Sequence, residues 1–274
     1  MVDTSASDAS PPALRSVAKV RRFATPRAIT ALILREMSST YGRTPLGYLW
    51  AVLEPVAGIA LLTAIFSLGF RSPPLGTSFP IFYATGLVPF MMYMDIGNKM
   101  MQSLMFSRSL LVYPRVTFVD ALVARFLLNL LTQLLVGYLL FTGILLLTDA
   151  RVSLDLPKIA LSFLMAASLG VGVGTLNCFI IGIIPAWQRI WAILNRPMFL
   201  LSCVIFLFET IPEPYQSILW YNPLVHILGL MRSGFYPYYE AAYVTPSYVF
   251  GFSLITLLLG LLFLRRYASF ILQQ

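Results

Sequence analysis

Charged residues are scarce in this sequence, and their scarcity excludes a soluble globular fold. They make up 11% of the 274 residues, whereas apolar residues make up 58%. A soluble domain carries roughly 25% charged residues, so this chain has too few to cover a surface that faces water. The mean hydropathy of +0.81 agrees with this reading. We therefore expect a membrane protein, whose length is best counted in membrane spans.

Residues that usually carry catalysis or bind metals are also few. His226 is the single histidine, which excludes a His-rich metal site and a histidine proton relay. No Gly-x-x-x-x-Gly-Lys-Ser/Thr motif is present, so the chain has no P-loop for ATP. Cys178 and Cys203 fall inside apolar runs, where buried small side chains are expected instead of a disulfide or a metal site. The sequence predicts no catalytic residue, no metal and no cofactor bound by this chain.

Six apolar stretches define an all-α polytopic membrane protein. The predicted spans are about 50–70, 79–94, 126–147, 159–184, 190–208 and 248–264. The net charge of +8 does not indicate nucleic-acid binding, because the basic residues flank the spans and form no dense stripe. Fifteen of the 19 lysines and arginines fall on the side of the N-terminus. The positive-inside rule then places both termini in the cytoplasm.

The N-terminal region divides into a tail and a helix. Residues 1–24, rich in Ser, Ala, Asp and Pro, predict a disordered cytoplasmic tail, and 25–274 form a single transmembrane domain. Between residues 25 and 45, apolar side chains recur at spacings of three and four, the period of a one-faced helix. We expect an amphipathic helix in the cytoplasmic interface. A helix merely tethered at the surface is the alternative.

Two segments between the spans are unusual. The cytoplasmic connection 95–125 mixes apolar and basic residues, and exposed apolar side chains there predict a docking element for another protein. A continuation of the second span plus a surface helix is the alternative. The outer segment 209–245 is aromatic and its apolar stretches are too short to span, which predicts a re-entrant helical hairpin. Glu209–Pro212 and Tyr221–Pro223 are its natural breaks.

Charged residues within the spans distinguish coupled carriers from other transporters. By the predicted boundaries the spans contain a single acidic residue, Glu54, which could instead pair with Arg43 at the cytoplasmic rim. An ion-coupled carrier or channel would be expected to have more, and it stays the alternative of another class. A membrane-embedded enzyme would need polar catalytic groups clustered at one depth, and the sequence offers none.

Several motifs, in their order, resemble one family. They are Arg43–Pro55 (RTPLGYLWAVLEP), Thr85–Phe90 (TGLVPF), Leu111–Arg115 (LVYPR), Asn222–Ile227 (NPLVHI), Arg232 and Gly234–Tyr236 (GFY). From about residue 25 to the C-terminus, the chain resembles the membrane subunit of type-2 ABC exporters, specifically the capsular polysaccharide export permeases. The order of the motifs is more specific than any one of them.

The resemblance implies a permease that exports lipid-linked capsular polysaccharide from the cytoplasm across the bacterial inner membrane. Its implied partners are a second copy of the chain, two copies of an ABC ATPase subunit that bind ATP and Mg, periplasmic and outer-membrane export proteins, and membrane lipids. Export of O-antigen, a teichoic acid or another lipophilic cargo is the nearest alternative.

The resemblance also implies three sets of site residues. The set that couples to the ATPase subunit is Leu104, Arg108, Leu111, Tyr113, Pro114 and Arg115. The translocation path, where sugars could stack on aromatic faces, is Trp50, Glu54, Tyr83, Tyr93, Trp187 and Trp191. The outer gate is Glu209, Asn222, Pro223, His226, Arg232 and Tyr236. An interfacial aromatic belt is the alternative for the path, and a local hydrogen bond is the alternative role of His226.

Overall fold

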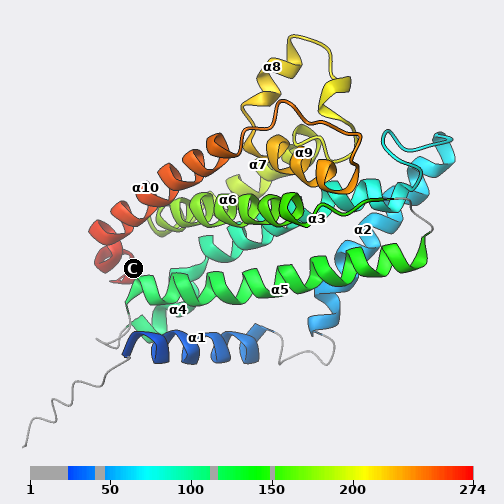
Figure 1. The fold of residues 1–274 in the computed structure, drawn as a ribbon. Coiled ribbons are helices and arrows are strands. Elements are labelled where there is room, and N and C mark those ends of the chain that lie inside the picture. The colour runs from blue at the N-terminus through cyan, green and yellow to red at the C-terminus, as the bar shows by residue number, and fades with distance from the viewer. Residues whose placement is uncertain (1–23, 41–46, 112–116, 149–151, 274) are drawn as a thin grey trace, which may run out of the picture.

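A computed structural model describes residues 24–40, 47–111, 117–148 and 152–273, and every regular element in these ranges is helical (Figure 1). In chain order the elements are α1 (Ala24–Thr40), α2 (Gly47–Gly69), α3 (Phe79–Met101), α4 (Ser103–Leu111), α5 (Phe118–Leu147), α6 (Leu156–Ile183), α7 (Trp187–Leu201), the 3-10 turn η1 (Phe208–Thr210), α8 (Tyr215–Trp220), α9 (Pro223–Phe235) and α10 (Pro246–Gln273).

Five of the described helices are long and apolar enough to cross a membrane: α2, α3, α5, α6 and α10. The predicted span 190–208 corresponds to α7, which has 15 residues and is shorter than the roughly 20 that a crossing needs. The chain leaves the helix after Leu201, and Cys203 takes a left-handed φ of 60°. The described residues therefore contain five candidate spans, one fewer than the sequence predicts.

The helices α3 and α5 extend well beyond the predicted ends of their spans. The helix α3 continues to Met101 instead of stopping near residue 94, and α5 begins at Phe118 instead of near residue 126. The expected connection of about 30 residues is reduced to 102–117, which contains α4. The added turns bring charged residues into the two helices: Asp95, Lys99, Asp120 and Arg125. Glu54 is thus not the sole charged residue of the candidate spans.

A glycine-rich face lets α6 pack closely at the centre of the bundle against α3, α9 and α10. A Cβ at Gly172 would lie 2.4 Å from the carbonyl oxygen of Ser253 on α10, and one at Gly174 would lie 2.7 Å from the carbonyl oxygen of Gly97 on α3. Such distances admit no side chain, so the backbones are in direct contact, as in membrane helix pairs with small interfacial residues.

The beginning of α5 is set by a capping box. The Thr117 hydroxyl accepts a hydrogen bond from the Asp120 backbone N–H (3.2 Å), and the Asp120 carboxylate accepts one from the Thr117 backbone N–H (2.9 Å). These two bonds satisfy backbone donors that a helix N-terminus otherwise leaves open. The helix therefore starts eight residues before its apolar run.

Two short helices follow η1 in the region where an outer hairpin is predicted. They are separated at Tyr221–Asn222, one of the predicted breaks. The helix α8 projects from the bundle at the top of Figure 1, whereas α9 is almost entirely buried against α6 and α3. At the opposite side of the molecule, α1 lies alongside α5 and contacts it (Figure 1).

Candidate functional site

Polar groups at spacings of three and four face one another where α3 and α5 run antiparallel, on the side of the molecule where α1 and α4 lie. Such spacing puts polar groups on one face of each helix. We call this contact the inner polar seam. Its members are Asp95, Lys99, Gln102, Arg125, Asn129 and Gln133.

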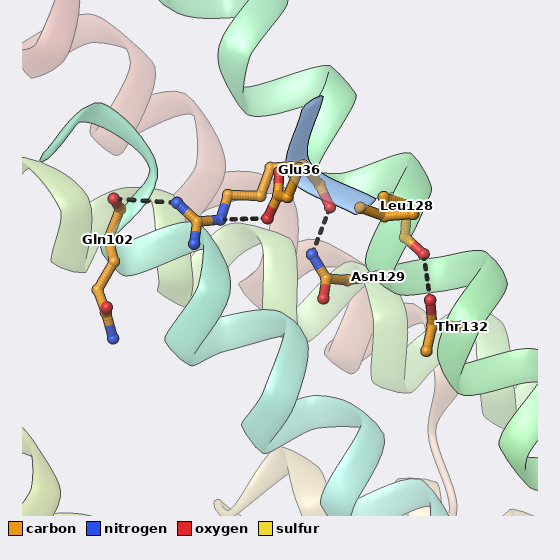
Figure 2. Close-up of polar contacts among 6 residues, drawn as sticks. Glu36, Gln102, Leu128, Asn129 and Thr132 are labelled. Atoms are coloured by element: carbon orange, nitrogen blue, oxygen red, sulfur yellow. Dashed lines mark hydrogen bonds and ion pairs between the residues drawn. The ribbon is translucent and has the colours of Figure 1, made fainter. Parts of the chain in front are cut away.

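Arg125 is the centre of the seam and joins four helices. Figure 2 labels two of its partners, Glu36 and Gln102. Its Nε lies 3.0 Å from Glu36 Oε1 on α1, and its Nη1 donates to the carbonyl oxygen of Gln102, between α3 and α4 (3.2 Å). The guanidinium also lies over the ring of Phe106 on α4, 4.4 Å from the ring centre. One buried side chain of α5 thus binds α1, α4 and the end of α3.

Glu36, the α1 partner of Arg125, is buried. Burial raises the pKa of Glu36 above its ordinary value, and the positive charges of Arg125 and Lys99 only partly oppose this rise. The ion pair is therefore one in which loss of water outweighs attraction, as is common for buried pairs. Its role is to specify how α1 docks rather than to add much stability.

Further hydrogen bonds engage polar groups of the seam, one between the two helices and two within α5. Gln133 Nε2 donates to Asp95 Oδ2, which links α5 to α3. Asn129 Nδ2 donates to the carbonyl oxygen of Arg125 (2.7 Å), and Thr132 Oγ1 donates to that of Leu128 (2.9 Å) (Figure 2). Because polar partners satisfy these groups, the two helices can carry them into an apolar surrounding.

The residues predicted to couple to an ATPase subunit separate on α4. Leu104 is buried in the core, whereas Arg108 is exposed, together with Met105 and Phe106. Met105 and Arg108, one turn apart, therefore offer an apolar side chain and a positive charge, whereas the ring of Phe106 also packs against Arg125. Outside the side chains that the structure describes are Leu111, Tyr113, Pro114 and Arg115.

Arg232 is the largest fully buried side chain of the described residues and lies in the predicted outer gate. Its guanidinium donates to the carbonyl oxygens of Cys203 (2.8 Å), Val204 (2.9 Å) and Phe206 (2.9 Å), in the turn that follows α7. Its face lies 4.7 Å from the ring centre of Phe82 on α3. Arg232 thus fixes the end of α7 to α3 and α9, and burial lowers its pKa.

His226 is fully buried on α9 and uses both ring nitrogens structurally. The Thr245 backbone N–H donates to Nδ1 (3.2 Å), so the proton resides on Nε2, which donates to the carbonyl oxygen of Trp220 (2.8 Å). Burial lowers the pKa of His226, which favours this neutral form. The residue ties α9 to α8 and to the segment before α10.

The other predicted gate residues support the same region. Asn222 caps α9, because its Oδ1 accepts from the Leu224 N–H (3.1 Å), and its Nδ2 donates to the carbonyl oxygen of Leu201 at the end of α7 (3.0 Å). Pro223 occupies the first turn of α9, where a missing N–H costs nothing. Glu209 accepts from the Tyr239 hydroxyl (2.9 Å), and Tyr236 is buried at the end of α9.

The predicted path residues do not share one surface. Tyr83 is 1% exposed and packs among aromatic side chains of α2 and α3, and Tyr93 is also buried. Trp50, in contrast, is 65% exposed on α2, with Glu54 exposed one turn further on. The remaining two predicted residues, Trp187 and Trp191, stack on one another on α7 with ring centres 6.2 Å apart.

The described contacts of these groups join helices and loops to one another. Among the residues that the structure describes, no three His, Cys, Asp or Glu side chains gather where they could hold a metal ion. The spacing of polar residues along 95–102 and 125–133 would have identified the seam. No local sequence pattern predicts that Glu36 pairs with Arg125, because 89 residues separate the two in sequence.

Comparison of the sequence with known proteins finds similarity to transporters. Residues 27–236 match the family described as ABC-2 type transporter. The chain is 32% identical over 237 residues to the polysialic acid transport protein KpsM of Escherichia coli, covering 86% of this chain and 92% of KpsM. It is 27% identical over 244 residues to the capsule polysaccharide export inner-membrane protein CtrC of Neisseria meningitidis (89% and 92%). It is 26% identical over 248 residues to BexB of Haemophilus influenzae, which has the same description (89% and 92%).

Proposed function

Because this chain belongs to the ABC-2 type transporter family, we propose that it is the permease subunit of an exporter that moves capsular polysaccharide out of the cytoplasm. The observation that carries this proposal is the identity of 32% to KpsM over 92% of that protein's length, together with CtrC and BexB, whose names specify capsule export and the inner membrane. The five candidate spans agree with a multi-pass protein of the bacterial inner membrane.

A separate ABC ATPase subunit supplies the energy in this proposal and carries the ATP and Mg. The exposed side chains of Met105 and Arg108, one turn apart on α4, form its docking surface. Movement of α4 is passed on through the contact between Phe106 and Arg125, and from there to α5 and, through Glu36, to α1. The inner polar seam is thus the coupling element between ATP hydrolysis and the spans.

Two copies of the chain form the translocation path. The helices α2 and α7 support this part of the proposal, since both expose apolar side chains along their length. Only 11% of the apolar stretch of α2 is buried, against 72% of that of α3. A second copy that covers α2 and α7 would place Trp50, Glu54 and the exposed face of α7 along one path between the subunits.

The topology of the proposal has six crossings, with both termini in the cytoplasm. The helix α7 and the turn held by Arg232 make the fifth crossing, and α8 with α9 form a hairpin that returns to the outer side. The excess of basic residues on the side of the N-terminus supports this orientation. The cargo is linked to a lipid, and periplasmic and outer-membrane proteins receive it.

Export and partner binding test the proposal together. In a strain that lacks this chain, the wild-type protein should restore surface capsule and copurify with an ATPase subunit. Arg108→Glu should reduce both by at least tenfold, whereas Arg189→Glu, which reverses another exposed arginine, should retain the ATPase. Accumulation of O-antigen or teichoic acid, instead of capsular polysaccharide, inside the strain that lacks this chain would overturn the proposed identity of the cargo. Copurification unaffected by Arg108→Glu would overturn the docking surface.

A further inference from the structure

A cavity of about 310 Å³ separates α7 from α3, α6, α9 and α10. We call it the α7 slot. It extends from Trp187, at the start of α7, to Asn222, which contacts the end of α7. Side chains of several helices form its apolar walls, among them Val173, Leu176, Ile180, Trp191 and Phe252.

Several polar groups at the slot are bonded within the protein. Trp187 Nε1 donates to Asn177 Oδ1 (2.9 Å), and Asn222 is engaged with the ends of α7 and α9. Thr256 Oγ1 lies 3.0 Å from the carbonyl oxygen of Phe252 on its own helix. Water or sugar in the slot would therefore find few partners, and apolar cavities of this kind stay dry.

Hydrocarbon is the ligand chemistry that fits. The slot is partly open to the surroundings of the protein, and a second helix, about 10 Å across with its side chains, is too wide for it. Three of the walls belong to candidate spans, so the slot lies at a depth where the surrounding solvent is lipid. We propose that the α7 slot binds an acyl chain of a membrane phospholipid.

The bound chain seats α7 on the bundle. Most side chains of α7 are exposed, and Asn195 is its one buried residue. Packing between α7 and α6 is sparse, because the slot lies between them. The lipid chain thus supplies contacts that protein side chains do not. If α7 lines the path, as the proposed function has it, lipid composition sets the position of a path helix; the binding itself does not depend on that function.

Tryptophan fluorescence tests the occupant directly. Trp50 and Trp220 are replaced by Phe, which leaves Trp187 and Trp191 at the slot as the only tryptophans, and these are excited selectively over tyrosine. The purified full chain is placed in nanodiscs of phosphatidylcholine with or without brominated acyl chains. A brominated chain in the slot should quench the emission by at least twofold.

Variants in which a larger side chain fills the slot distinguish quenching by a lipid inside the slot from quenching by lipid around the protein. Val173→Phe places a larger side chain inside and should remove at least half of the quenching, whereas Leu164→Phe, exposed on the same helix, should leave it unchanged. Leu176→Phe repeats the test if the Val173 variant does not fold.

Two results would overturn the proposal. Equal quenching in the filled and control variants would mean that lipid reaches the tryptophans only from outside. Quenching that a lipid-linked polysaccharide abolishes would mean that the slot prefers the cargo's lipid. Neither readout requires transport, so a failure here is distinct from a failure of the proposed function.

Discussion

Replacement of Arg232 by Met should release the turn that follows α7. The side chain of Met has a similar length but donates no hydrogen bond, so the carbonyl groups of Cys203, Val204 and Phe206 lose their partner. Each orphaned buried carbonyl costs about 1–3 kcal/mol. Removal of the buried guanidinium returns several kcal/mol of desolvation, so we expect a net loss at the lower end of the summed range, about 3 kcal/mol.

The two natural cysteines supply the assay. Both Cys203, in the turn, and Cys178, on α6, are buried at 1% exposure and should react slowly with a maleimide. A loss of about 3 kcal/mol corresponds to about a hundredfold larger open population, so Arg232→Met should speed the labelling of Cys203 by that factor. Labelling of Cys178, read from its own peptide by mass spectrometry, should not change.

The control separates the hydrogen bonds from the charge. Arg71→Met removes an exposed arginine and should leave Cys203 protected. Arg232→Lys keeps the charge but loses the planar fork, so its labelling should lie between wild type and Arg232→Met. Equal labelling of Cys203 in the Arg232→Met and Arg71→Met variants would refute the view that Arg232 holds the turn.

Two further predictions concern α6 and α1. Gly172→Ala should lower the melting temperature markedly, because the new Cβ would lie 2.4 Å from a carbonyl oxygen of α10. The control Gly143→Ala, which has open space around it, should leave the melting temperature unchanged. Similar melting temperatures for the two variants would contradict the close packing of α6. The pKa of Glu36 is raised when α1 is docked, so the docked state binds a proton more readily than the undocked state. Docking of α1 should therefore strengthen as the pH falls from above the folded-state pKa toward 4.5, the ordinary value, and weaken as the pH rises. Amide hydrogen exchange of α1, corrected for the intrinsic rate, should show this trend in wild type and not in Glu36→Gln; weaker protection on acidification would indicate an ordinary salt bridge.

The apolar runs of the sequence predict most membrane helices but misplace ends that depend on distant partners. Hydropathy treats Asp95 and Arg125 as residues that seek water, so the predicted spans stop short of both. In the structure these residues are satisfied by Gln133, Glu36 and the backbone of Gln102, and the helices continue.

The sequence mispredicts the end of α7 for the opposite reason. Residues 203–208 are apolar and would extend a helix by composition alone. Their carbonyl groups instead turn toward Arg232, about 30 residues later, which no local pattern reveals. The capping function of Asn222 before Pro223, by contrast, is local, and the sequence predicts a break there.

The direct backbone contacts of α6 have a consequence for movement. A helix held by glycine-to-carbonyl contacts on two sides cannot slide by a fraction of a turn, because each contact has one geometry that avoids a clash. We therefore expect α6, α3 and α10 to move together as one rigid unit. In the proposed transport cycle, movement would then fall to the helices outside this unit, among them the lightly packed α2 and α7.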